Sequence, residues 1–171
     1  MDLSGLDIPR IKAIVQEKWR SGPELWPVKV MSLSRVMQLE RELGRSLTQV
    51  GGYFTCLRAV RGKTPAEMEE LLGFQPGSFC TGVVVYRLER LPLANEFELR
   101  GYSQLPGGET FDGIVLRRPG MVRPQYFSRD GEQLKYIPGL GVEQWELTPR
   151  TQIGAAEIQR VDAGQRFTNW R

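Results

Sequence analysis

The chain has 171 residues, of which 40% are hydrophobic, a length that supports one sizeable core but is short for two full domains. Its net charge is only +3, with positive and negative residues interspersed along the whole length, a pattern that is not typical of a disordered chain. The sequence contains no histidine, which excludes Ser-His-Asp and Cys-His nucleophiles, imidazole general bases and most catalytic zinc sites. We therefore expect one folded domain over residues 1–171, helical over 1–50 and mainly β over 51–171.

Helices are expected where apolar residues recur at three-to-four-residue steps or where a capping pattern stands. The three predicted helices cover residues 8–20, 32–43 and 64–73. The first is entered through Pro9, and the second ends at Gly44. The third begins at a capping box, in which Thr64 is the N-cap and Glu67 the reciprocal acid.

Strands are expected where β-branched and aromatic runs alternate with glycine and proline. The predicted strands cover residues 53–60, 82–88, 97–101, 113–116, 125–127, 142–147 and 156–161. Because helices come first and strands later, the order favours an α+β fold over alternating βαβ units.

Cysteine and charge patterns indicate little about partners or compartment. Cys56 and Cys80 both lie in apolar runs, so buried thiols are expected, with a disulfide only in an oxidising compartment. Residues 117–123 concentrate positive charge; a solvated loop is the first interpretation and a contact to phosphate or nucleic acid the second. The sequence has neither a Sec-type signal at its start nor an apolar stretch long enough to cross a bilayer, so we expect no membrane partner.

Two predicted strand segments carry glutamine or glutamate two residues apart, a spacing that points both side chains to one face. The first is Glu96-Phe97-Glu98 and the second is Gln144-Trp145-Glu146. An isolated pair of this kind is most often a solvated strand face. The second segment also follows a glycine-bearing loop at 138–141 and precedes a proline-bearing turn, and this context distinguishes it from the first.

The segment from Gln144 onward resembles the C-terminal signature of ADP-ribosyltransferases, a mobile loop leading into a [Glu/Gln]-x-Glu strand and a further strand. In that family an arginine on an early strand and a serine motif on a middle strand precede the Glu motif. The segment 53–62, with Arg58, looks like the early strand, and Ser103 occupies the middle position. The resemblance covers residues 53–161. Its middle motif departs from the usual Ser-Thr-Ser, because Gln104 follows Ser103.

The resemblance implies a fold in which N-terminal helices pack on a split antiparallel β-sandwich, and an enzyme that transfers ADP-ribose from NAD to a macromolecule. By this resemblance the catalytic residues are Glu146 and Gln144, and the NAD-binding residues are Arg58, Ser103 and either Tyr102 or Phe111. An arginine fork can bind the NAD pyrophosphate bidentately. A carboxylate hydrogen-bonded to a ribose hydroxyl stabilises the positive charge that develops as nicotinamide leaves. Neither step requires imidazole.

The expected protein is a bacterial effector or toxin domain delivered to the cytoplasm of a target cell, with a protein or nucleic-acid acceptor and a cognate immunity protein as partners. Three alternatives stay open. Water replaces the acceptor in an NAD glycohydrolase on the same fold. A non-catalytic immunity, adaptor or phage-associated module would use its β surface for binding. A carboxylate-metal nuclease would be built around Glu96, Glu98 and Arg100. The NAD interpretation fails if the Arg58 and Glu146 side chains lie on opposite faces or more than about 15 Å apart, with no cleft between them.

Overall fold

The computed structural model describes residues 13, 26–72, 74–92, 96–98, 109–111, 114–116, 126–127, 133–134, 145–168 and 170. Most of the predicted helix at 8–20 and the basic stretch at 117–123 lie outside the described residues. The same holds for three predicted site residues, Tyr102, Ser103 and Gln144. No helix among the described residues is long and apolar enough to cross a membrane.

Residue 13 is helical, and from β1 onward the described chain alternates irregularly between helices and strands. The helices are α2 (Leu33–Leu43), α3 (Leu57–Val60) and α4 (Pro65–Leu71). The strands of the main sheet are β1 (Pro27–Ser32), β2 (Gln49–Val50), β3 (Tyr53–Cys56), β4 (Gly82–Leu88), β5 (Phe97–Glu98), β10 (Trp145–Leu147) and β11 (Ile153–Asp162). The other strands are β6 (Glu109–Phe111), β7 (Ile114–Leu116), β8 (Tyr126–Phe127) and β9 (Gln133–Leu134).

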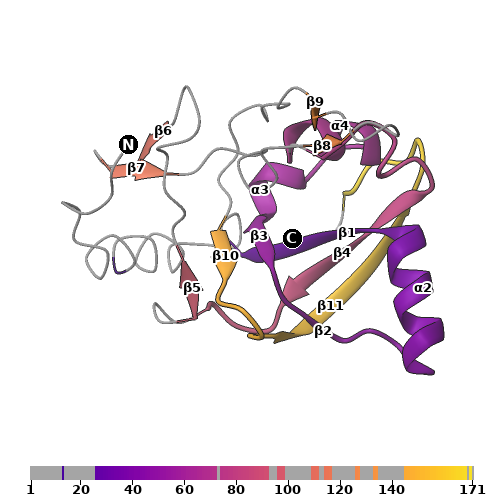
Figure 1. Ribbon diagram of the computed structural model, residues 1–171, viewed down its shortest axis with the longest axis horizontal. Helices are drawn as coiled ribbons and strands as arrows, with labels where there is room; N and C mark the ends of the chain where they lie inside the picture. The colour runs from indigo at the N-terminus through magenta and orange to yellow at the C-terminus, as the bar shows by residue number, and fades with distance from the viewer. Residues whose placement is uncertain are drawn as a thin grey trace.

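One curved sheet forms the centre of the molecule (Figure 1). Its strand order is β2-β11-β4-β1-β3-β10-β5, and all its neighbouring strands are antiparallel. The two edge strands, β2 and β5, are only two residues long, so five longer strands make up most of the sheet. Two separate two-stranded sheets pair β6 with β7 and β8 with β9.

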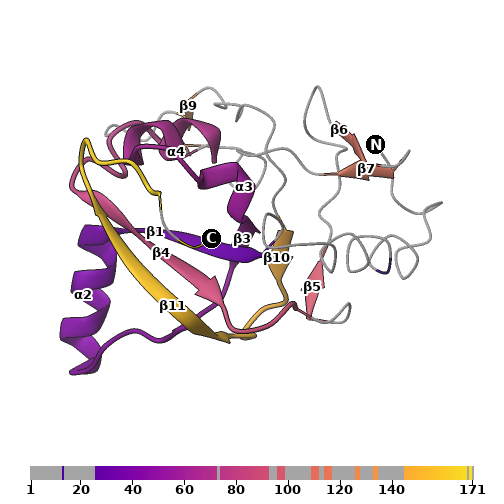
Figure 2. The same ribbon diagram turned by 180° about the vertical axis from the view of Figure 1, so that it is seen from behind.

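Both faces of the sheet are covered. The sequence of β4 is consistent with this, because it is an almost continuous apolar run. Val84 and Tyr86 point to one face, where they pack with Leu33 and Val36 of α2. The alternate residues, including Val83, pack on the other face with α3, α4 and the chain that follows β11. Turning the molecule shows β11 running along β4 from the opposite side (Figure 2).

The segment after β11 returns across α3 and α4 and closes the second face. The side chain of Phe167 is fully buried, and its backbone N–H donates to the Lys63 carbonyl. Arg166 donates to the Glu67 carboxylate and to the Gly62 carbonyl, each at 2.9 Å. The chain end therefore contributes to the same core as the central strands.

The α+β class and several predicted boundaries are confirmed. The strand at 82–88 has the predicted bounds. Helix α2 ends at Gly44, which adopts the left-handed conformation (φ 68°) that favours glycine. Thr64 caps the third helix as predicted, because its side chain accepts a hydrogen bond from the Glu67 N–H, whereas the Glu67 carboxylate accepts from Arg166.

Other predictions were wrong in particular places. The strand predicted over 53–60 ends at Cys56, and the following residues turn into α3, whose Leu57 and Val60 are fully buried. Strand β1 was not predicted at all, although it lies in the part expected to be helical. Cys80 is exposed rather than buried, and Cys56 and Cys80 form no disulfide.

Candidate functional site

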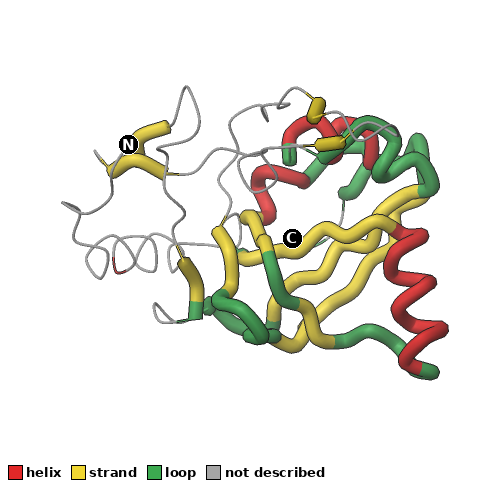
Figure 3. The backbone as a smooth tube through the Cα atoms, in the orientation of Figure 1, coloured by secondary structure: helices red, strands yellow, loops and turns green. Residues whose placement is uncertain are grey.

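Strands β1 and β3 are paired at one end and diverge beyond it, which leaves a split in the middle of the sheet. Only two residue pairs join these strands, Pro27 with Cys56 and Val28 with Thr55. Beyond them, β1 continues to pair with β4 as far as Ser32, while β3 pairs on its other side with β10. The tube view places the end of β1 next to the start of α2, on the side away from β10 (Figure 3).

A cavity of about 310 Å³ lies at this split. Its lining comes from β1, β3, the first turn of α2 and the segment after α4. The lining residues are Lys29, Val30, Met31, Ser32, Arg35, Tyr53, Phe54, Thr55, Leu72, Phe74, Ser78 and Phe79. Among the described residues of the lining, two carry cationic side chains, four carry hydroxyl groups and none carries a carboxylate. Its volume is at the lower end of the range for small-molecule sites, about 300–1,000 Å³.

Lys29 connects the cavity to the start of β3. A Cβ added to Gly52 would stand 3.3 Å from the Lys29 Nζ, so the ammonium group lies directly beside this glycine. Gly52 has a φ of 74°, a conformation that side-chain-bearing residues rarely adopt. Its carbonyl accepts a hydrogen bond of 2.8 Å from the Leu147 N–H of β10. The ammonium, the start of β3 and strand β10 therefore meet at one place.

A carboxylate holds the opposite wall of the cavity. The two oxygens of Glu69, on α4, accept hydrogen bonds from the Gly77 N–H at 2.9 Å and the Phe79 N–H at 2.8 Å. The rings of Phe74 and Phe79 lie against each other, with centroids 4.6 Å apart and planes tilted by 42°. Phe79 is buried, while Phe74 is half-buried. Glu69 thus fixes a loop that presents aromatic surface to the cavity.

Glu146 lies in β10, in register with Tyr53 of β3, which lines the cavity. Its neighbour on the other side is Glu98 of β5. The strand is anchored by Trp145, which is 2% exposed and stacks on Phe54 with ring centroids 5.9 Å apart. The sheet register therefore places the backbone of Trp145 and Glu146 beside Phe54 and Tyr53, two residues of the cavity lining.

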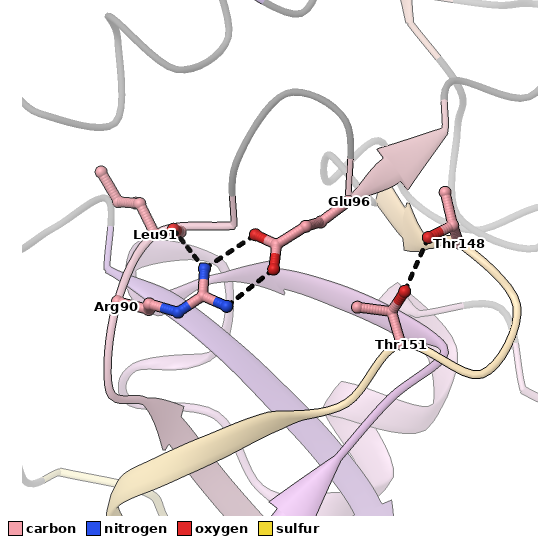
Figure 4. Close-up of polar contacts among 5 residues, drawn as sticks. All are labelled: Arg90, Leu91, Glu96, Thr148 and Thr151. Atoms are coloured by element: carbon pink, nitrogen blue, oxygen red, sulfur yellow. Dashed lines mark hydrogen bonds and ion pairs between the residues drawn. The ribbon is translucent and has the colours of Figure 1, made fainter.

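Polar contacts fix the ends of β4, β5 and β10 (Figure 4). Arg90 donates to both oxygens of Glu96, each at 2.7 Å, and these hydrogen bonds raise the pKa of the Arg90 guanidinium. The Glu96 carbonyl accepts from the Thr148 N–H at 2.6 Å, and the hydroxyls of Thr148 and Thr151 lie 2.7 Å apart. These contacts connect the strand that carries Glu146 to the rest of the sheet.

The same contacts weaken the nuclease alternative. Its Glu96 carboxylate is engaged in the bidentate ion pair with Arg90, so both of its oxygens already accept hydrogen bonds. In the part of the chain that the structure describes, no group of three His, Cys, Asp or Glu side chains could hold a metal ion.

The structure brings the predicted site residues together only in part. Glu146 is in strand β10, paired with Tyr53 of the cavity lining. Arg58 is not on a strand; it is an exposed residue of α3 and does not line the cavity. Phe111 lies in β6, paired with Ile114 in a sheet separate from the main one. The turn from β3 into buried α3 is the physical reason why Arg58 leaves the sheet.

Lys29 was missed because β1 was missed. The alternation of Val28 and Val30 with Lys29 is a strand signal that the sequence carries, and it would have placed Lys29 on a central strand. Arg35 was inside the predicted second helix, but nothing in the helix pattern indicates that its first turn faces a cavity.

No protein-family model, curated protein or solved structure matches the chain.

Proposed function

We propose that the protein is an NAD-dependent ADP-ribosyltransferase that modifies a macromolecule, acting as a bacterial effector or toxin domain. The observation that carries the proposal is the register of β10, in which Glu146 stands opposite Tyr53 at the wall of a cationic cavity. A second observation supports the proposal. Strands β3 and β10, which belong to the segments that resemble the family's early strand and its Glu motif, are far apart in sequence but are neighbours in the sheet.

In this proposal Glu146 is the catalytic carboxylate. It accepts a hydrogen bond from a ribose hydroxyl of NAD and stabilises the positive charge that develops on the ribose. The bond between the ribose carbon and the nicotinamide nitrogen breaks, and nicotinamide leaves as a neutral molecule with the bonding electron pair. A nucleophile of the acceptor then bonds to the same carbon and releases its proton to solvent. The acceptor is a protein or a nucleic acid, and Gln144 is the residue proposed to orient it.

The role first assigned to Arg58 changes in this proposal. Because Arg58 is an exposed residue of α3 outside the cavity lining, it is a poor anchor for a pyrophosphate held beside Glu146. In this proposal the cationic residues of the cavity, Lys29 and Arg35, replace Arg58 as the anchor.

The test is release of nicotinamide from NAD by the pure protein, followed by chromatography, with and without an extract that supplies acceptors. We expect Glu146→Gln to reduce the rate by at least about a hundredfold, a typical loss when one transition-state-stabilising group is removed. The matched control is Glu70→Gln, which removes an exposed carboxylate from α4. Unchanged turnover in Glu146→Gln, or no turnover by the parent protein under either condition, would contradict the proposal.

The same assay separates transfer from hydrolysis. Rapid release of nicotinamide and free ADP-ribose without any acceptor would assign the site to an NAD glycohydrolase. Retention of the ADP-ribose label on a macromolecule supports transfer.

A further inference from the structure

The outer edge of β11 has no strand beside it over most of its length. Strand β2 is the end strand of the sheet, but it pairs with β11 only at Ile153 and Gly154. On its other side β11 pairs with β4 as far as Asp162 (Figure 2). In the part of the chain that the structure describes, no strand pairs with the outer side of β11 beyond Gly154. We define residues 156–160 as the free edge.

The backbone of the free edge turns hydrogen-bonding groups away from β4. In an antiparallel ladder, the backbone groups of successive residues point alternately toward the paired strand and away from it. The Val161 carbonyl oxygen points toward β4, where a Cβ added to the first residue of that strand would stand 2.5 Å from it. At the next residue, Asp162, the N–H donates to the Gln165 side chain at 3.1 Å and the carbonyl accepts from the Gln165 N–H at 3.0 Å. By this alternation, the N–H and C=O groups of Ile158 and Arg160 also point away from β4.

The free edge carries an exposed apolar side chain and little protection against pairing. Ile158 is 47% exposed, an unusual value for a large hydrophobic side chain among the described residues. Edge strands are usually protected from other chains by proline, lysine or a bulge. The bulge of β11 lies between Ala155 and Glu157, and residues 158–160 contain neither proline nor lysine. An exposed isoleucine on such an edge indicates a surface that pairs with another strand.

Gln159 has a polar atom that needs a partner. Its Oε1 atom is buried, and no described residue donates a hydrogen bond to it. A buried acceptor without a donor lowers stability, so such atoms usually have a partner. A strand that pairs with the free edge brings a side chain directly across from Gln159.

Contacts at both ends of the free edge limit the register of such a strand. At one end the edge is closed by the chain before β2, because the Thr48 carbonyl accepts from the Ala155 N–H at 2.8 Å. At the other end it is closed by Gln165, which binds the outward groups of Asp162. The open positions are therefore 156–161, and a pairing strand has to form its hydrogen bonds within this interval.

We propose that a second copy of the chain pairs with the free edge, with the two β11 strands antiparallel about a two-fold axis at Gln159. In this register Ile158 of each copy is opposite Arg160 of the other, so their outward N–H and C=O groups form four hydrogen bonds. The two Gln159 side chains are directly across from each other, where the amide of one copy can donate to the Oε1 of the other.

The side chains of the free edge are complementary to themselves in this register. Arg160 forms an ion pair of 2.7 Å with Asp162 of its own strand, and Glu157 forms one of 2.6 Å with Arg87. No residue is directly opposite a residue of like charge. The aliphatic part of Arg160 covers the exposed Ile158 of the second copy. One segment therefore supplies both halves of the interface, which is why the occupant is a second copy.

Sedimentation velocity of the purified full chain tests the pairing. We expect a dimer that is populated at about 100 µM, because so short an edge contact makes a weak interface. Ile158→Pro removes the outward N–H from both copies, and proline is tolerated on an edge strand where the N–H faces solvent. We expect this change to raise the dimer Kd at least about tenfold.

Two lysine variants complete the sedimentation experiment. Ile158→Lys keeps the backbone N–H but places a lysine opposite Arg160 of the second copy, so it should also raise the Kd at least about tenfold. It remains informative if Ile158→Pro does not fold, which circular dichroism of each variant shows. The matched control is Met37→Lys, because Met37 is 49% exposed on α2 and is not part of the free edge. We expect its Kd within about twofold of the parent.

Disulfide cross-linking tests the register. In a Cys80→Ser background, which removes the exposed thiol, Gln159→Cys places two thiols across the two-fold axis. Their Cβ atoms would be about 4.5–5.5 Å apart, near the spacing that a disulfide needs. We expect oxidation to give a covalent dimer. The matched control is Glu157→Cys, two residues away on the same face, whose thiols would be about 13 Å apart and should stay unlinked.

Three results would overturn the pairing. A parent that stays monomeric at about 500 µM, well above the concentration expected for a weak interface, would leave the free edge to a strand of another protein. A dimer that persists in both Ile158 variants would show that the copies meet through another surface. Equal cross-linking at positions 157 and 159 would exclude the register. None of these results depends on NAD turnover, so the pairing and the transferase proposal are tested separately.

Discussion

Glu69 is the residue whose replacement most directly tests how the cavity wall is built. Its carboxylate accepts from two backbone N–H groups of the loop after α4, at Gly77 and Phe79, and the second bond is partly buried. The change Glu69→Gln keeps the size of the side chain but leaves one acceptor oxygen for two donors. One charge-assisted bond is lost and the other becomes neutral.

A hydrogen bond to a charged group contributes about 1.5–3 kcal/mol, and the exposed Gly77 bond can be replaced by water. We therefore expect Glu69→Gln to lower the free energy of unfolding by about 1.5 kcal/mol, and Tm by about 3–6 °C for a chain of this length. Urea denaturation followed by circular dichroism measures the change. Glu70→Gln, the adjacent exposed residue, should lie within about 0.5 kcal/mol of the parent. If the two variants unfold at the same urea concentration, Glu69 does not hold the wall.

Three further predictions concern the sheet. Burial, and to a smaller extent the Glu40 carboxylate, raises the pKa of Tyr86 from 10.0 to about 12. The neutral phenol therefore contributes stability that is present below pH 10 and is lost as the pH rises through about 12. The loss is on the order of 3 kcal/mol, and Tyr86→Phe should lack this slope in pH-dependent denaturation; identical slopes would contradict it. Gly82→Ala should lower the free energy of unfolding, measured by thermal denaturation, by more than about 2 kcal/mol. The reason is that the added Cβ would stand 2.5 Å from the Val161 carbonyl oxygen, at a residue whose φ is 115°. A parent-like Tm would contradict the prediction, because it would show that the backbone relaxes. A double-mutant cycle on Arg90 and Glu96 should give a coupling of about 0.5–1 kcal/mol, since the pair is bidentate but partly exposed, and zero coupling would show that other contacts hold β5.

The sequence predicts a helix or strand correctly where the local signal and the tertiary packing favour the same structure. The cap at Thr64, the stop at Gly44 and the apolar run of β4 each depend on a few neighbouring residues, so the sequence alone located them. The strand predicted through Arg58 failed for the opposite reason. Its apolar residues continue past Cys56, but tertiary packing buries them as a helix under the sheet rather than as a strand within it.

The candidate site divides in the same way. The strand that carries Glu146 could be predicted from its segment, because a strand signal is a local property, and the role of Glu146 stays a prediction. The cavity could not be predicted from the sequence, because its cations are on β1 and α2 while its aromatic wall follows α4. Only the three-dimensional arrangement shows that these elements surround one space, and no spacing rule connects Lys29 with Phe74.

The pairing of β10 with β3 also has a consequence for how the chain folds. Trp145 pairs with Phe54 across about ninety positions of sequence, and such distant contacts slow folding because a long loop must close first. Until β10 and β11 leave the ribosome, the free edges of β3 and β4 can pair with other chains. During synthesis, the unfinished sheet is therefore exposed to aggregation.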